Sequence, residues 1–130
     1  MFPATARSPD TGGPHSPSLR ITTRDTAVSA VVCRLDGEAD QDTRHELDVA
    51  LAKAVAEGPV MLLVDLAPLS FCDSACLNAL LTAQHDAEEA GVWLVLVGAG
   101  PRLRRLLEIT GADRMFTLRP ELRVTRPTIG

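Results

Sequence analysis

The stretch V60-M-L-L-V-D-L-A-P-L-S-F-C-D-S74 decides the fold of this chain. Its first seven residues form a nearly continuous apolar run of strand length, which is typical of a central strand covered on both faces. Asp73 and Ser74 then precede LNALLTAQHDAEEAG, in which leucines recur at helical spacing, and both residue types cap free backbone N–H groups. The stretch therefore predicts a buried strand, a short connection and a helix over residues 74–90 that Gly91 ends.

A further strand and helix are predicted downstream of Gly91. The apolar run VWLVLVG, residues 92–98, has strand length. Pro101 then opens the helix PRLRRLLEIT, because proline is tolerated at the first helical position, and Gly111 ends that helix. MFTL, residues 115–118, predicts either a last short strand or a helical turn.

Two β-type runs stand upstream of the central strand. LRITTR from Leu19 and VSAVVCRLDG up to Gly37 are separated by polar residues and predict an opening β-hairpin. Residues 40–43 offer several caps for a helix in RHELDVALAKAVAEG, which stops at Gly58-Pro59. The order β-β-α-β-α-β-α predicts an α/β fold with a mixed sheet of four to five strands, an N-terminal hairpin and helices packed against the sheet.

A length of 130 residues suits a single domain. Residues 1–17 are rich in Pro, Gly, Ser and Thr with almost nothing apolar to bury, which predicts a disordered arm. We expect the folded domain over residues 18–119. The polar segment 120–130 is expected to be a C-terminal tail of undetermined state.

Composition excludes several classes of function. A net charge of −4 and an aromatic content of 3% disfavour nucleic acid as a partner. No stretch has the length of a membrane span or the pattern of a signal peptide, so we expect a cytoplasmic protein without a membrane partner. Three cysteines are an odd number in such a chain, which argues against a disulfide framework and predicts reduced thiols.

Cys72 and Cys76 stand four residues apart, but two thiolates supply only half of a zinc site and no further ligand pair follows. We therefore expect no metal and no cofactor. A redox role for Cys76 is open, because a helix N-terminus lowers the pKa of a thiol. Buried small apolar side chains are the more common role of such cysteines.

Catalysis has little support in the sequence. Ser74 with His45 or His85 could be a hydrolase pair, but the Gly-x-Ser-x-Gly elbow is absent. Gly98-Ala-Gly100 lacks the third glycine of a nucleotide-binding loop, and the only lysine is Lys53, in the wrong place for a phosphoaspartate receiver. We therefore expect a chain that is not an enzyme.

Ser74 has two interpretations. An isolated Asp-Ser pair most often serves only to cap a helix. A hydroxyl at this position is also well placed for phosphorylation, because a helix N-terminus favours a dianion. About two added negative charges would then change how the surface fits a partner. The arginines of the third helix are similarly ambiguous, as a solvated face or as a rim for an acidic partner: Arg102, Arg104, Arg105 and Arg114.

The stretch from Val64 to Phe116 closely resembles the STAS family and, within it, the anti-sigma factor antagonists. The matching motifs are VDLAPLSFCDS, LNALLTAQHDAEEAG, VWLVLVG and PRLRRLLEITGADRMF. The earlier RLDGEAD is similar to the family's Gly-Glu-x-Asp segment after its second strand. The resemblance spans most of residues 28–118.

In that family the serine after the aspartate is phosphorylated by a GHKL-type partner that is both anti-sigma factor and serine kinase. The unphosphorylated form binds this partner and frees the sigma factor. The resemblance thus implies that Ser74 is the phosphoacceptor of a transcription switch, and it places Asp65 near the same edge. The residues that it implies for partner binding are Glu38, Asp40, Asp73, Ala75, Cys76 and Asn78.

Ala75 and Cys76 depart from the family, which usually has a small Ser or Thr and then Gly at these positions. Cysteine would add a side chain where glycine lets another backbone approach. An alternative function is therefore a STAS module that is never phosphorylated and serves in ligand sensing or scaffolding. The oligomeric state is open, with a homodimer as one option.

Overall fold

The computed structural model describes residues 19–27 and 29–121. The predicted arm over residues 1–17 and most of the predicted tail over 120–130 lie outside the described residues.

The chain opens with the predicted hairpin. Strands β2 (Leu19–Ala27) and β3 (Ala30–Ala39) pair antiparallel. A short strand, β5 (Leu69–Cys72), runs parallel to the far end of β3, with Ala39 opposite Cys72. The pairing shifts register just after Gly37, whose φ of 117° suits a residue without a side chain.

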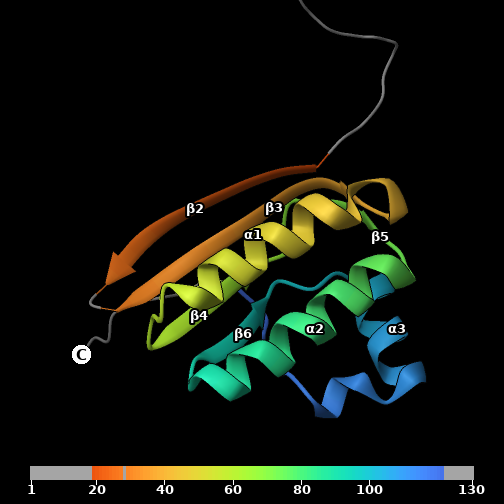
Figure 1. Ribbon diagram of the computed structural model, residues 1–130. Helices are drawn as coiled ribbons and strands as arrows, with labels where there is room; N and C mark the ends of the chain where they lie inside the picture. Colours follow the sequence, from red (N-terminus) through yellow and green to blue (C-terminus); the bar gives the residue numbers. More distant parts are fainter. Residues whose placement is uncertain (1–18, 28, 122–130) are drawn as a thin grey trace, which may run out of the picture.

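The remaining strands are parallel to β3. They are β4 (Met61–Asp65), β6 (Trp93–Val97) and β7 (Thr117–Arg119), and the sheet order is β2-β3-β4-β6-β7. The described residues thus form one mixed six-stranded sheet, with β5 attached to β3 beside this row (Figure 1). The predicted fold class is confirmed.

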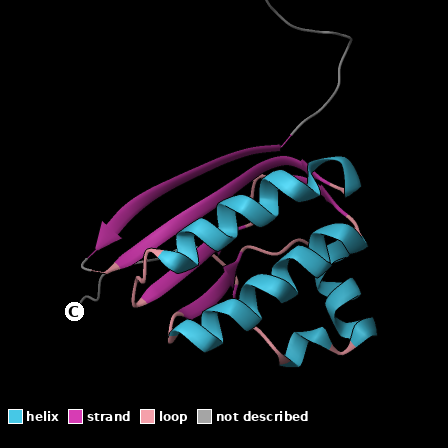
Figure 2. Ribbon diagram, in the orientation of Figure 1, coloured by secondary structure: helices cyan, strands magenta, loops and turns pink. Residues whose placement is uncertain are grey.

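Three helices pack on one face of the sheet (Figure 2). They are α1 (Arg44–Ala56), α2 (Ser74–Ala90) and α3 (Pro101–Thr110). Two short 3-10 turns, Gln41–Thr43 and Ala112–Arg114, precede α1 and follow α3. None of these helices is both long and apolar enough to cross a membrane. The predicted bounds of α2 are confirmed at both ends.

The central strand β4 contributes to both faces of the sheet. Leu62 and Val64 lie in the main core under the helices, and Leu63 lies in a second cluster with Val32 and Val95. All three β4 side chains are buried. The interpretation of the apolar run as a strand covered on both faces is therefore confirmed.

Strand β5 lies within the segment that the sequence predicted as a plain connection, and it raises the strand number above four to five. It has only four residues between Pro68 and Asp73, which is too short for an alternating pattern to show. Its partner is more than 30 residues earlier in the chain, where the Ser70 hydroxyl donates to the Gly37 carbonyl oxygen at 2.9 Å. Local sequence therefore does not reveal this strand.

Cys72 and Cys76 are joined by a disulfide, so the expectation of reduced thiols is wrong for this pair. Strand β5 ends at Cys72 and α2 begins two residues later, which brings the two Cα atoms to 5.5 Å. This separation is ordinary for a disulfide. Cys33 on β3 is free and buried.

Candidate functional site

Two helical segments begin side by side at the edge of the sheet where β3 and β5 end (Figure 1). Asp40 caps the 3-10 turn that leads into α1, and Asp73 caps α2. The Asp73 N–H donates to the Ala39 carbonyl oxygen at 3.3 Å, which holds the two chain segments together. Backbone pairing therefore positions the start of α2 against the end of β3.

Asp73 stabilises the first turn of α2 with its side chain. Its Oδ1 accepts from the N–H of Ala75 at 2.9 Å and of Cys76 at 3.3 Å. These N–H groups belong to the set that a helix leaves without internal partners. Since the Asp73 side chain caps the helix, the neighbouring Ser74 side chain is not needed as a cap.

Ser74 is the first residue of α2 and is exposed. Among the described residues, none makes a hydrogen bond to its hydroxyl. A helix N-terminus carries partial positive charge from its free N–H groups. The position therefore combines an exposed serine with the partial positive charge of a helix N-terminus.

Asp40 forms a capping box with Thr43. Its Oδ1 accepts from the N–H groups of Asp42 at 3.0 Å and Thr43 at 3.2 Å, while the Thr43 Oγ1 accepts from the Asp40 N–H at 2.9 Å. Asp65, at the end of β4, is buried and accepts from the Ala67 N–H at 3.1 Å. Both carboxylates therefore have local structural partners.

The residues that the sequence associated with Ser74 divide into two groups. Asn78 is exposed one turn further along α2, and Glu38, Asp40 and Asp73 are half-buried, whereas the side chains of Ala75 and Cys76 are buried at 5% and 1% exposure. The expectation that Cys76 adds a side chain at the docking surface is therefore wrong, because its sulfur is turned inward and bonded to Cys72.

Sequence reasoning missed Phe71, which is 38% exposed on β5 and pairs in register with Glu38. The signal in the sequence that pointed to Phe71 is its place two residues before the Asp73 cap, in a chain that has only three phenylalanines. We use the name Ser74 edge for the surface formed by six residues: Glu38, Asp40, Phe71, Asp73, Ser74 and Asn78. This surface thus includes one apolar side chain together with polar groups.

A cleft of about 180 Å³ adjoins this surface, between β5 and the start of α3. Its lining includes Leu69, Phe71, Cys72, Pro101 and Leu103. Cys72 is half-buried and reaches this cleft, whereas Cys76 does not line it. Of the two linked cysteines, Cys72 is therefore the one nearer to solvent.

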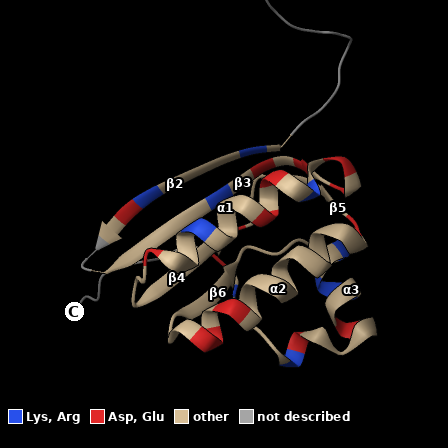
Figure 3. Cartoon of the chain, viewed as in Figure 1, with Lys and Arg blue, Asp and Glu red and all other residues tan. Residues whose placement is uncertain are grey.

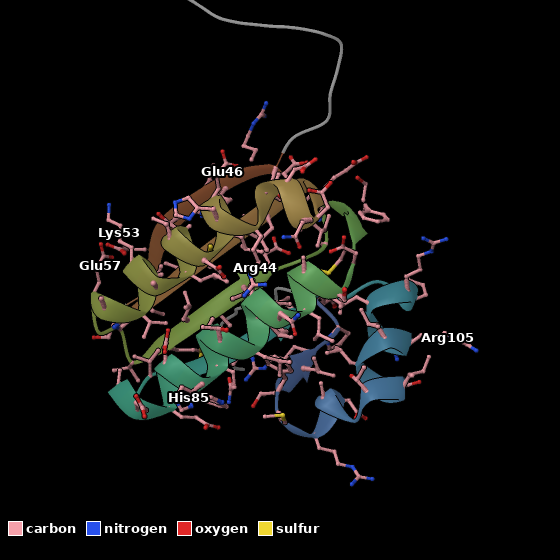
Figure 4. All side chains as sticks on the ribbon, turned by 45° about the vertical axis from the view of Figure 1, so that its right-hand side comes forward. Arg44, Glu46, Lys53, Glu57, His85 and Arg105 are labelled. Carbon is pink, nitrogen blue, oxygen red and sulfur yellow. A yellow bond between two sulfur atoms is a disulfide. The ribbon has the colours of Figure 1, made fainter. Side chains whose placement is uncertain are left out.

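Charge differs between the two sides of the cleft (Figure 3). Glu38, Asp40 and Asp73 make the Ser74 edge acidic, and on α3 the exposed arginines make a basic side. Figure 4 shows Arg105 projecting away from α3. The Ser74 edge therefore offers negative charge and one aromatic side chain to a partner.

The other reactive groups lie apart from Ser74 or are sequestered. His85 is eleven residues along α2, which corresponds to about 16 Å of helix, and its Nε2 lies 3.4 Å from Glu89 Oε2 on the exposed side (Figure 4). Burial raises the pKa of the Cys33 thiol to about 11. In the described ranges no three His, Cys, Asp or Glu residues gather in a way that could hold a metal ion.

Two curated relatives are similar to this chain over most of its length. The anti-sigma-F factor antagonist RsfB of Mycobacterium tuberculosis is 31% identical over 101 residues, which are 78% of this chain and 81% of the relative. The anti-sigma-B factor antagonist of Listeria monocytogenes is 30% identical over 102 residues, which are 78% of this chain and 88% of that protein.

Solved structures agree with this similarity. The crystal structure of an anti-sigma factor antagonist from Mycobacterium paratuberculosis has a TM-score of 0.74 and 30% identity, covering 81% of this chain and 88% of that chain. The family profile described as "Mlab, STAS domain" matches residues 22–120. The chain therefore belongs to the STAS domain family, in which its relatives are anti-sigma factor antagonists.

Proposed function

We propose that this chain is an anti-sigma factor antagonist that binds an anti-sigma factor through the Ser74 edge while Ser74 is unphosphorylated. The names of the relatives support the class of function. The observation that supports the site is the exposed Ser74 hydroxyl at the start of α2, beside a cap supplied by Asp73. Binding would withdraw the anti-sigma factor from its sigma factor.

The partner in this proposal is also a GHKL-type serine kinase. The Ser74 oxygen attacks the γ-phosphorus of ATP, the bond to the β–γ bridging oxygen breaks, and the serine proton is lost as ADP leaves. The product is a dianion at the first position of α2, where the partial positive charge of the helix N-terminus stabilises it. Because the Ser74 hydroxyl makes no hydrogen bond to the described residues, its modification removes no interaction that stabilises the fold.

Phosphorylation would weaken docking for two reasons. The Ser74 edge already contains the carboxylates of Glu38, Asp40 and Asp73, so about two further negative charges repel any acidic or apolar surface. A phosphate pressed against a partner must also lose its water, which is costly without a compensating cation. The unmodified edge presents Phe71 and a neutral hydroxyl instead.

The modification is tested by incubating the purified chain with the partner kinase and Mg-ATP, followed by peptide mass spectrometry. We expect one phosphoryl group on Ser74, none on Ser74→Ala and normal modification of Thr82→Ala. Thr82 is a matched control because it is an exposed hydroxyl residue two turns further along the same helix. Phosphate at another residue, with Ser74→Ala fully modified, would exclude this site.

The switch is tested by measuring affinity for the partner by calorimetry. Ser74→Asp is expected to bind at least about tenfold more weakly than the parent chain, because it places a charge on the Ser74 edge. Ser74→Ala should retain the parent affinity. Thr82→Asp adds the same charge at an exposed position two turns further along α2 and should bind normally. Equal affinities of the two Ser74 variants would contradict the switch.

The alternative function, ligand sensing without phosphorylation, would use the cleft beside β5. Its volume of about 180 Å³ is below the roughly 300 Å³ at which pockets begin to enclose drug-sized ligands. The cleft beside β5 is therefore too small to enclose such a ligand by itself. A small molecule that co-purifies with the chain in native mass spectrometry would favour the alternative.

A further inference from the structure

The disulfide between Cys72 and Cys76 encloses the proposed phosphoacceptor. Cys72 is the last residue of β5, and Cys76 is the third residue of α2. The covalent loop between them contains Asp73, Ser74 and Ala75. A bond at this place therefore constrains the backbone on both sides of the Ser74 hydroxyl.

The end turns of a helix are its least stable parts, and in the first turn the N–H groups have no partners within the helix. Here the Asp73 side chain satisfies two of these groups, and the Asp73 N–H is bonded to Ala39 on β3. The disulfide adds a covalent tie from the turn to β5, which is itself paired with β3. With the bond formed, the first turn of α2 is tied covalently to the end of β5, which restricts its unwinding.

We propose that Cys72 and Cys76 form a reversible redox site that controls the modification of Ser74, with the disulfide locking the first turn of α2 and the dithiol releasing it. This inference rests on the proposed function for its effect on phosphorylation. In this scheme the kinase aligns the Ser74 oxygen with the γ-phosphate more readily when the first turn of α2 can open locally. Oxidation therefore slows phosphorylation and keeps the chain in the form that binds its partner.

A low-molecular-weight disulfide is the oxidant in this scheme. The Cys72 thiolate attacks one sulfur of the reagent, its S–S bond breaks, and the first small thiol leaves with a proton. The Cys76 thiolate then attacks the Cys72 sulfur of the mixed disulfide and releases the second small thiol. The two protein thiols lose two electrons and two protons, and the reagent becomes two thiols.

Accessibility assigns the order of these two steps. Cys72 is the more accessible cysteine of the pair, since it is half-buried and lines the cleft beside β5, and we therefore assign the first attack to it. Cys76 is 1% exposed and is reached only from Cys72. Cys33 takes no part, because it is fully buried on β3 and its thiol has a pKa raised to about 11 by that burial.

The first experiment uses the full chain equilibrated with dithiothreitol or with oxidised glutathione, then alkylated and mapped by peptide mass spectrometry. We expect a Cys72–Cys76 link only in the oxidised sample, with Cys33 a free thiol in both. Amide hydrogen exchange over residues 74–77 should be about tenfold slower in the oxidised sample. The absence of the link, or equal exchange rates in both samples, would overturn the inference.

Cysteine variants distinguish an effect of the Cys72–Cys76 pair from an effect of oxidation elsewhere in the chain. Cys33→Ala removes a buried cysteine outside the pair and should keep the full difference between the two samples. Cys72→Ala and Cys72→Ser should both lose it and exchange at the fast rate under either condition. A redox effect that persists in both Cys72 variants would exclude the proposed pair as its origin.

The second experiment measures the initial rate of Ser74 phosphorylation in the same samples. It should be about tenfold slower after oxidation, because the same local opening precedes both amide exchange and phosphoryl transfer. Equal rates would overturn the control of Ser74 even if the link forms. Absence of phosphorylation in both samples would instead refute the proposed function, and with it the redox control of Ser74 phosphorylation. Whether the disulfide locks the first turn of α2 is decided by the hydrogen-exchange experiment alone.

Discussion

Asp73 and Ser74 share the start of α2 but have different tasks. The carboxylate of Asp73 is engaged with the N–H groups of Ala75 and Cys76, whereas the Ser74 hydroxyl has no hydrogen-bond partner among the described residues. The stability of the first turn thus depends on Asp73, whereas the proposed modification would depend on the adjacent Ser74. A substitution of Ser74 therefore leaves the helix cap of Asp73 in place, and a substitution of Asp73 leaves the Ser74 hydroxyl in place.

Replacing Asp73 by alanine should lower the free energy of unfolding by about 1 kcal/mol, since two backbone N–H groups lose their acceptor. Urea unfolding under reducing conditions measures this loss without support from the disulfide. Asp73→Asn retains a capping oxygen and should lose much less. An alanine variant as stable as the asparagine variant would show that the cap contributes little.

Cys33 makes stability depend on alkaline pH. Its pKa in the folded chain, about 11, lies above the ordinary value of 9.0, so the folded state keeps its proton longer than the unfolded state. This contribution is complete below pH 9 and is lost as pH rises towards 11, at up to about 1.4 kcal/mol per pH unit.

The measurement compares unfolding curves at pH 8, 9 and 10 for a chain with Cys72→Ala and Cys76→Ala, which prevents thiol exchange. Adding Cys33→Ala should remove this part of the alkaline loss. An identical pH dependence with and without Cys33 would show that its burial is not maintained.

At the scale of elements, tight turns position the helices against the sheet. After β6, Gly98 has a φ of 72°, and a Cβ placed on it would lie 3.0 Å from the Ala67 Cβ. The turn between β6 and α3 therefore packs directly against the turn after β4. The start of α3, which follows this turn, lines the cleft beside β5.

Gly98→Ala should therefore destabilise the chain by about 2 kcal/mol, from left-handed backbone strain together with a steric clash. Gly91→Ala is the matched control, because Gly91 has a similar φ of 74° but no atom within 4 Å of the position that its Cβ would occupy. It should lose only about 1 kcal/mol, from the strain alone. Equal losses of stability for the two variants in thermal unfolding would show that Ala67 moves away from the new side chain without an energetic penalty.

Local signals predicted most elements and part of the site. Ser74, Gly91 and Pro101 are helix boundary residues whose effect is visible in the sequence, and they indicated the bounds of α2 and the start of α3. Strand β5 depends on pairing with a distant segment and has no such signal. Both the disulfide and the placement of Phe71 follow from β5, so they could not be predicted either.

At the scale of the whole molecule, one main core joins all three helices to the sheet. Leu80 of α2, Leu47 of α1 and Leu107 of α3 belong to the same buried cluster. The helices therefore stabilise one another through shared contacts with the strands. We expect a single cooperative unfolding transition for the described region.

Leu80→Ala should lower the free energy of unfolding by about 2–5 kcal/mol, because a fully buried leucine leaves a cavity when it is truncated. Ile109→Ala on α3 is the control, since Ile109 is 72% exposed and should cost within about 0.5 kcal/mol. Denaturant unfolding followed by circular dichroism distinguishes them. A small loss at Leu80 would contradict a tightly packed core.

The attachment of β5 to β3 has a consequence for the timing of biosynthesis. The Ser70 hydroxyl bonds to Gly37, and the Asp73 N–H bonds to Ala39, so α2 acquires its native starting geometry only when segments more than 30 residues apart have met. Such distant pairing is completed late compared with helix formation. Because β3 precedes β5 in the chain, a growing polypeptide can give Ser74 its native setting on the ribosome only after both segments have emerged and paired.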